Sequence, residues 1–178
     1  KNGLIKSVDK LLDEDGIFVI EAPYLISLID KMEYDTIYLD HLEYLSLKPI
    51  VNFFDKHGFQ VFDVEEYPIH GTSLRVFVGR KGKHTVESSV DRLLKLEDEK
   101  GIYKREVLDD FARKVDNHRK EFVSMMHDLK SQGKRIVGIS APAKGNTLLN
   151  YCKLNTNVID WMTEKAEIKH GHYTPGMH

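Results

Sequence analysis

Two short apolar runs, each followed by a stretch with helical periodicity, most constrain what this chain can fold into. Residues 17–22 (IFVIEA) and 135–140 (RIVGIS) have the length and apolar content of buried strands, and the first is typical of a parallel strand. Apolar residues at steps of three and four predict helices between the strands. These helices are expected over residues 4–13, 47–57, 86–100 and 104–131. Strands alternating with helices predict an α/β fold.

Two further runs complete the expected elements of the first half. Residues 59–67 and 73–80 alternate between apolar and polar positions, which predicts an antiparallel pair joined through the turn at 71–72. The polar run 81–84 is a natural boundary between domains. In the second half, a helix is expected to start near Thr147 or Leu148, and the next strand at 158–162.

Composition excludes several classes of function. The 178 residues carry a formal net charge of -2, so the chain has no basic field for general nucleic-acid binding. No apolar run approaches the roughly 20 residues that span a bilayer. The single cysteine, Cys152, forms no internal disulfide, which agrees with a cytoplasmic location. The nine histidines lack the spacing of a metal site. The oligomeric state is not fixed by these features.

The stretch 34–44 (YDTIYLDHLEY) carries the densest chemistry of the chain. It holds three tyrosines, three carboxylates and one histidine between an expected strand and an expected helix. Ligands of α/β proteins bind at the ends of strands, a histidine moves protons near neutral pH, and a phenol can stabilise an oxyanion. The alternative interpretation is a polar connector whose tyrosines lie half-buried over the sheet.

The stretch 141–147 (APAKGNT) joins an expected strand to an expected helix through small residues. Small residues let a phosphate or ribose approach the backbone, and the amides at a helix N-terminus attract anions. The run has neither the G-x-G-x-x-G pattern nor the Gly-Lys-Ser/Thr of a P-loop. A nucleotide cradle and a tight turn without a ligand are therefore both compatible with the pattern.

Four pieces of the chain together resemble one enzyme family. They are the runs 34–41 (YDTIYLDH), 70–75 (HGTSLR), 141–150 (APAKGNTLLN) and 171–176 (GHYTPG). In content, order and separation they are similar to the sugar C-methyltransferases, which use S-adenosylmethionine to methylate nucleotide-linked keto-deoxysugars. The resemblance extends over essentially the whole chain, and the run 141–150 is its most specific part.

The resemblance implies an architecture. Residues 1–82 correspond to the C-terminal portion of a Rossmann-like methyltransferase domain, residues 83–132 to a helical connection, and residues 133–178 to a truncated Rossmann-like α/β C-terminal domain. The chain begins without methionine and ends in a loop-like run, which indicates a piece of a longer protein. By the resemblance, the S-adenosylmethionine loop and a zinc-binding domain lie upstream. This piece alone is then expected to be inactive.

The resemblance also implies catalytic residues. The family pattern Tyr-x-Glu/Asp-His places the base at His41, which removes a proton from the carbon next to the ketone so that an enolate forms. Tyr38 corresponds to the tyrosine that hydrogen-bonds the enolate oxygen. Asp40 stands where glutamate is more usual, and its expected role is to orient His41 or to contact a sugar hydroxyl.

Candidate substrate-binding residues lie in the other pieces. Arg75, Lys144 and Asn146 are the candidates for the nucleotide diphosphate, because a guanidinium fork suits phosphate and a lysine supplies a point charge. Tyr173 is expected to shape the same cleft from the C-terminal loop. For Arg75 the alternative is an ion pair at the rim of the sheet.

Two other functions remain open at this stage. The chain could be a non-catalytic module that binds a nucleotide-sugar or docks a partner protein. It could also belong to another Rossmann-type enzyme such as an oxidoreductase, which the missing G-x-G-x-x-G disfavours. A glycine-rich loop and a cysteine cluster encoded upstream would favour the methyltransferase interpretation over the module.

Overall fold

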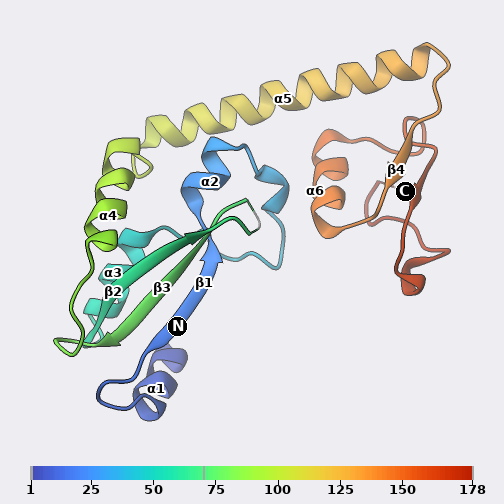
Figure 1. Ribbon diagram of the computed structural model, residues 1–178. Coiled ribbons are helices and arrows are strands. Elements are labelled where there is room, and N and C mark those ends of the chain that lie inside the picture. Colours follow the sequence, from blue (N-terminus) through green and yellow to red (C-terminus); the bar gives the residue numbers. More distant parts are fainter. Residues whose placement is uncertain (1, 70, 178) are drawn as a thin grey trace. The chain divides into compact units, whose positions relative to one another are not determined.

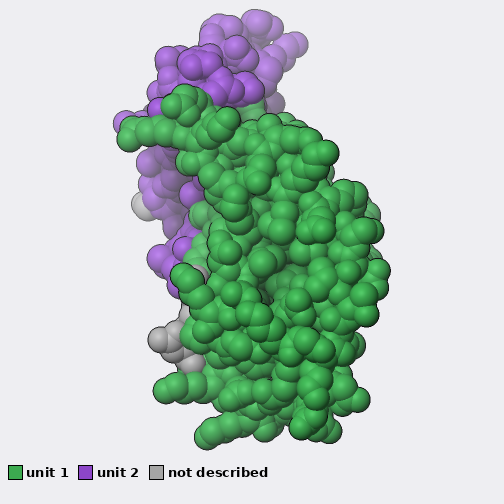
Figure 2. All heavy atoms as spheres, turned by 90° about the vertical axis from the view of Figure 1, so that its left-hand side faces the viewer, with its two compact units in different colours: residues 1–33, 43–108 green, residues 34–42, 109–178 purple. Residues whose placement is uncertain are grey.

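The computed structural model describes residues 2–69 and 71–177, and its mixed α/β content confirms the expected fold class. The chain divides into two compact units (Figures 1 and 2). Unit 1 is formed by residues 1–33 and 43–108, and unit 2 by residues 34–42 and 109–178. His70, the first residue of the second family motif, lies outside the described residues.

The helices and strands are distributed over the two units, and one helix belongs to both. Unit 1 contains α1 (Asn2–Leu11), β1 (Phe18–Pro23), α2 (Leu25–Asp30), α3 (Leu47–Asp55), β2 (Phe59–Tyr67), β3 (Ser73–Arg80) and α4 (Ser88–Lys100). Helix α5 (Arg105–Ser131) begins in unit 1 and continues through unit 2. The rest of unit 2 contains η1 (Tyr34–Thr36), β4 (Val137–Ile139), α6 (Ala143–Cys152), β5 (Trp161–Thr163) and η2 (Glu167–Lys169).

The sheet of unit 1 has the strand order β1-β3-β2, with β3 antiparallel to both neighbours (Figure 1). The predicted antiparallel pairing of β2 with β3 is confirmed. The expectation that residues 17–22 form a buried parallel strand is wrong, because β3 pairs with β1 in the antiparallel sense. Burial alternates along β1, so the apolar run has one face toward the core and one face partly open. A continuous apolar run does not distinguish these two cases.

The core of unit 1 lies between this sheet and helices α1, α3 and α4. Leu47 of α3, Leu93 of α4 and Val78 of β3 are fully buried in one cluster. The apolar periodicity that predicted these helices thus describes the faces that pack on the sheet. Gly101, in the left-handed conformation at φ 63°, ends α4 as a C-terminal glycine commonly does.

A buried carboxylate holds two helices of unit 1 together. Glu97 of α4 is fully buried, and it accepts hydrogen bonds from the backbone amides of Leu47 and Lys48 at the start of α3. Tyr103 donates its hydroxyl to the same carboxylate. Ser46 occupies the N-cap position of α3 but makes no side-chain cap, and its hydroxyl lies 2.9 Å from the Tyr103 hydroxyl instead. Glu97 therefore replaces Ser46 as the cap of α3.

Unit 2 contains a β4-α6-β5 arrangement in which the two strands pair in parallel (Figure 1). Two expectations are wrong here. The run 135–140 is not a buried strand, since β4 has only three residues and Ile139 is 89% exposed. Helix α6 begins at Ala143 and not near Thr147, because Pro142 occupies the extended N-cap position and two good helix formers, Ala143 and Lys144, follow it directly. The strand expected at 158–162 is shifted toward the C-terminus, to Trp161–Thr163.

Helix α5 carries the core of unit 2 on one face. Met126 packs with Leu149, Cys152 and Leu154 in a buried cluster, whereas the neighbouring Met125 is half exposed. Of these two methionines, Met126 is thus the one that packs in the core. None of the described helices has the length and apolar content to cross a bilayer.

The Glu97 cap generates a stability prediction. Substituting Glu97→Ala leaves the buried amide of Leu47, the amide of Lys48 and the Tyr103 hydroxyl without their carboxylate acceptor. We expect the free energy of unfolding to fall by about 3 kcal/mol, measured by urea denaturation. The control is Glu99→Ala, which removes the exposed ion pair with Lys95 at 3.7 Å. Equal losses in the two variants would contradict the capping role.

Candidate functional site

The segment 34–42 packs with the C-terminal half of the chain, in unit 2. The segment starts with η1, one turn of 3-10 helix. Two turn hydrogen bonds follow, from Ile37 N to the Tyr34 carbonyl and from His41 N to the Tyr38 carbonyl, each at 3.0 Å. The start of the segment is buried, whereas Leu39 is 87% exposed. The part that carries Tyr38 and His41 is thus an ordered loop open to solvent.

The His41 ring is held by two hydrogen bonds that define its tautomer. Nδ1 lies 2.8 Å from the Thr36 carbonyl oxygen, which can only accept, so Nδ1 carries the proton. In the neutral ring Nε2 then holds the lone pair, and the Tyr38 hydroxyl lies 3.2 Å from it. The two rings pack at 4.4 Å between centroids. An imidazole whose Nε2 lone pair accepts only from a phenol can serve as a general base once that phenol turns away.

The third predicted catalytic residue lies apart from this pair. Asp40 is exposed, and among the described residues it makes no hydrogen bond or ion pair with His41. The carbonyl of Thr36 orients the imidazole in its place.

Tyr34, the first residue of this segment, packs against α5 and α6. The Tyr34 hydroxyl is 3.0 Å from Nδ1 of His118, and the Tyr34 ring packs edge-on against His118 and Tyr151. Burial, together with the nearby Cys152 and Tyr151, raises the pKa of Tyr34 to about 12. The hydroxyl therefore stays protonated across neutral pH.

The turn between β4 and α6 has a strained backbone. Ser140 adopts φ 68°, a left-handed conformation unusual for a residue other than glycine, and its amide donates to Thr163 Oγ1 at 3.3 Å. Such outliers concentrate at functional sites. Because α6 begins at Ala143, Lys144 and Asn146 lie in its first turn, with the Asn146 amide bonded to the Pro142 carbonyl at 3.1 Å.

A cleft of about 790 Å³ opens beside the N-terminus of α6, entirely within unit 2. This volume is in the range of small-molecule sites. Its walls come from the 141–143 turn, the end of β5 and the C-terminal loop. Among the predicted residues, Asn146 and Tyr173 line it, and Lys144 does not. The other lining residues include Trp161, Met162, Ile168, His172, Thr174 and Pro175.

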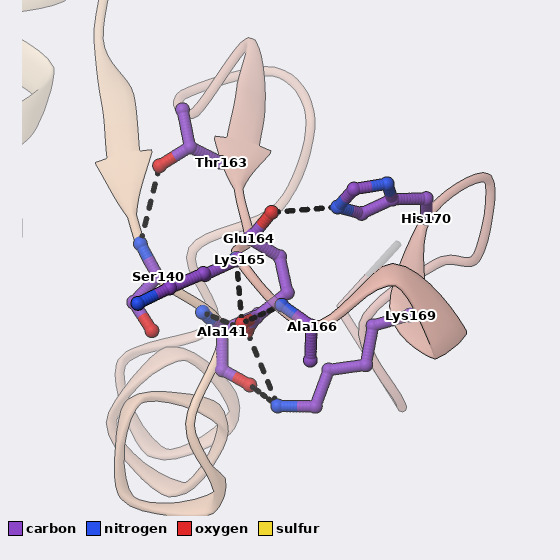
Figure 3. A network of polar contacts seen from close by, with 8 residues as sticks. All are labelled: Ser140, Ala141, Thr163, Glu164, Lys165, Ala166, Lys169 and His170. Carbon is purple, nitrogen blue, oxygen red and sulfur yellow. Dashed lines mark hydrogen bonds and ion pairs between the residues drawn. The ribbon is translucent and has the colours of Figure 1, made fainter.

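One carboxylate ties the walls of this cleft together (Figure 3). Glu164, directly after β5, accepts from the amide of Ala141 at 2.9 Å and from Lys169 Nζ at 3.2 Å. Its other oxygen accepts from the amides of Lys165 at 2.8 Å and Ala166 at 3.0 Å. Lys169 Nζ also donates to the Ala141 carbonyl at 3.0 Å, so both backbone polar groups of Ala141 are held.

The Glu164 contacts determine its protonation. Hydrogen bonds from the amides of Ala166 and Ala141, followed by Lys169, lower the pKa of this carboxyl to about 2. Four donors match the four lone-pair positions of a carboxylate, so Glu164 has no acceptor capacity left for a ligand. We therefore interpret Glu164 as a clamp on the turn.

The third and fourth family motifs meet at Asn150 of α6. Its Nδ2 donates to the Asn146 carbonyl and to the Pro175 carbonyl, each at 2.9 Å. Gly176 lies against the same amide at φ 86°, and a Cβ there would come within 2.0 Å of Asn150 Oδ1. The C-terminal loop that presents Tyr173 is thus held on α6, and residue 176 is restricted to glycine.

Arg75 lies in unit 1, where its guanidinium already has partners. Nη2 donates to Glu21 at 2.8 Å, Nη1 lies 4.0 Å from Glu65, and the group stacks on Tyr67 at 3.8 Å from the ring centroid. The hydrogen bond to Glu21 is the main reason that the pKa of Arg75 is raised. The ion pair considered as the alternative interpretation is therefore present.

Sequence reasoning missed three contributors to the site. These are the Thr36 carbonyl, the Tyr34 anchor and the Glu164–Lys169 clamp. A carboxylate directly after a strand is a signal that would have indicated Glu164. The described residues contain no cluster of three or more histidine, cysteine or acidic side chains placed to share a metal ion.

The chain as a whole is similar to known proteins. A family model described as the C-methyltransferase C-terminal domain matches residues 68–178, so the chain belongs to that family. C-methyltransferase NovU of Streptomyces niveus is 32% identical over 174 residues, 97% of this chain and 41% of the relative. The chain therefore spans about two fifths of the length of this curated relative.

The lowered pKa of Glu164 predicts a pH-dependent contribution to stability. A folded-state pKa of about 2 against an ordinary value of 4.5 means that the stabilisation is full above 4.5 and is lost as pH falls toward 2. The difference in Tm between the unchanged chain and Glu164→Gln should therefore be largest at neutral pH and disappear near pH 2. Thermal unfolding across this range tests it, with Glu167→Gln, in the same loop, as the control. A difference that stays constant with pH would contradict the prediction.

Proposed function

We propose that this chain is the substrate-side part of a C-methyltransferase that methylates the carbon next to the ketone of a nucleotide-linked keto-deoxysugar. The observation that carries the proposal is the His41 ring, whose Nδ1 is protonated toward Thr36 and whose Nε2 faces Tyr38. Membership of the C-methyltransferase family supports methyl transfer to carbon. The four motifs that resemble the sugar C-methyltransferases support the nucleotide-sugar.

In the proposed reaction, Nε2 of His41 accepts the proton from the carbon next to the ketone. The electron pair of that C–H bond forms the enolate, and the proton stays on the imidazolium, whose Nδ1–H still donates to the Thr36 carbonyl. The Tyr38 hydroxyl, now directed at Nε2, turns to the ketone oxygen and stabilises its developing charge. S-adenosylmethionine, when bound to the full-length protein, supplies the electrophilic methyl group.

The described residues do not fit a cofactor loop of the usual kind. Within this part of the chain, the only strand that leads through a short turn into a helix alongside a parallel partner is β4, and its turn is Ser140-Ala141-Pro142. We propose that residues outside this chain bind S-adenosylmethionine, and that this piece alone does not catalyse methyl transfer.

We further propose that the cleft beside α6 binds the nucleotide part of the substrate. Because the Ala141 amide is already donated to Glu164, the phosphates would rely on Lys144, Asn146 and the free amides at the start of α6. Tyr173, exposed on the rim of the cleft, would cover the nucleotide. For Arg75, which lies in unit 1, a phosphate contact would require the exchange of its carboxylate partners. Asp40, exposed beside His41, would contact a sugar hydroxyl.

The base role predicts a loss of proton abstraction. In the full-length protein, His41→Ala should lower kcat by about 10³-fold and Tyr38→Phe by about 10²-fold. A second measurement omits the methyl donor and follows exchange of the proton next to the ketone in deuterium oxide by NMR. Both variants should slow this exchange, and His127→Ala, at an exposed position of α5, should not. Undiminished exchange in His41→Ala would remove His41 from the base role.

The nucleotide cleft predicts binding by the 178-residue chain itself. Titration with thymidine diphosphate should shift amide signals of residues 141–150 and of Tyr173. Lys144→Ala and Asn146→Ala should each weaken binding about 10-fold, since each removes a hydrogen bond to a charged group. Lys134→Ala, at an exposed position before β4, is the control. Absence of shifts around 141–150 would contradict this part of the proposal, and binding without any activity of the full-length protein would favour the docking module.

A further inference from the structure

The geometry points to Tyr34 as the positioning residue for His41. Tyr34 fixes the start of the 34–42 segment on α5 and α6. This holds the Thr36 carbonyl within hydrogen-bond distance of the His41 imidazole. This inference rests on the proposed function, because the role of His41 as the base comes from there. The positioning concerns the orientation and tautomer of the His41 ring, so it can be tested without measuring enzyme activity.

Tyr34 has the burial and contacts of an anchor. Its side chain is 7% exposed, its hydroxyl lies 3.0 Å from Nδ1 of His118, and its ring packs at 5.7 Å from the His118 ring and 5.6 Å from the Tyr151 ring between centroids. His118 in turn stacks on Phe122 of the same helix at 6.1 Å. Helices α5 and α6 therefore both contact this one side chain.

Three hydrogen bonds to backbone carbonyls connect Tyr34 to the His41 imidazole. The Tyr34 carbonyl closes η1 by accepting from Ile37 N at 3.0 Å. The Thr36 carbonyl accepts both from Tyr38 N at 3.2 Å and from His41 Nδ1 at 2.8 Å. Since Thr36 is itself buried two residues after Tyr34, a displacement of Tyr34 displaces the acceptor that selects the His41 tautomer.

The remainder of the segment offers little to hold it. Ile37, Leu39 and Leu42 are exposed, so the apolar side chains beyond η1 do not bury the loop within the described structure. Loss of the Tyr34 anchor should therefore let η1 shift, and His41 should then populate both neutral tautomers. A base misplaced by about 1 Å loses on the order of 10² in rate.

Helix α6 gives this anchoring a further consequence. Its first turn borders the cleft, and its last turn supplies Tyr151 and Cys152 to the Tyr34 site. The helix has 10 residues, so about 15 Å of rigid helix joins the two ends. The 34–42 segment, which carries the proposed base, and the proposed nucleotide cleft thus both contact the single helix α6.

The first experiment measures the tautomer of His41 in the 178-residue chain. Chains with ¹⁵N-labelled histidine rings are compared by long-range ¹H–¹⁵N NMR, and His41→Gln assigns the signal. The unchanged chain and Tyr34→Phe should show protonated Nδ1, and Tyr34→Ala should show a mixture of tautomers. Tyr24→Ala, which removes a buried ring from unit 1, is the control and should leave the tautomer unchanged.

A second variant keeps the test decisive if Tyr34→Ala fails to fold. His118→Leu removes the ring that packs edge-on against Tyr34 and leaves the buried Tyr34 hydroxyl without this partner. Tyr34→Phe, in contrast, removes the hydroxyl itself and keeps the ring contacts, so only His118→Leu should shift the His41 tautomer in the direction of Tyr34→Ala, by a smaller amount. An unchanged tautomer in every folded variant that disturbs the Tyr34 site would overturn the inference.

Kinetics of the full-length protein separate positioning from general damage. Tyr34→Ala should lower kcat by about 10²-fold with KM for the nucleotide-sugar within about twofold of the original value. A fall in kcat without a tautomer change would overturn the inference. A tautomer shift combined with full activity of His41→Ala would leave the positioning intact and overturn the proposed base.

Discussion

The hydrogen bond from Nδ1 of His41 to the Thr36 carbonyl determines what the site can do. A backbone carbonyl can only accept, so a contact of 2.8 Å specifies the proton position without a second titratable group. An acidic partner in this place would add a negative charge and its own pH dependence to the site. With a carbonyl, the imidazole keeps one orientation and one lone pair, and the Tyr38 phenol is the group directly beside it.

Carboxylates acting on backbone amides organise both units. Glu97 caps α3 across the core of unit 1, and Glu164 holds the turn before α6 in unit 2. In each case a negative charge meets the amides at the start of a helix or turn, where the unpaired N–H groups concentrate positive potential. Both carboxylates also meet a side-chain donor, Tyr103 for Glu97 and Lys169 for Glu164. Each is therefore satisfied by the protein itself.

The sequence predicted the elements whose signals are local and missed those that depend on distant contacts. Helical periodicity and alternation identified α3, α4, α5 and the β2–β3 hairpin, because these patterns reflect one buried face. The direction of β1 is determined by β3, some fifty residues later, and no property of residues 17–22 encodes it. The site shows the same division: Tyr38 and His41 are three residues apart in one motif and contact each other, whereas Tyr34 and His118 are separated by 84 positions.

The amide of Asn150 has a consequence for the chemical ageing of the protein. Its NH₂ group faces two carbonyl oxygens, those of Asn146 and Pro175. Deamidation would keep the shape of the side chain but replace this donor by a charged acceptor, so attraction to both carbonyls would become repulsion. The loop that carries Tyr173 would then lose its hydrogen bond from Asn150 to the Pro175 carbonyl. One wall of the cleft is therefore sensitive to the chemical state of a single amide.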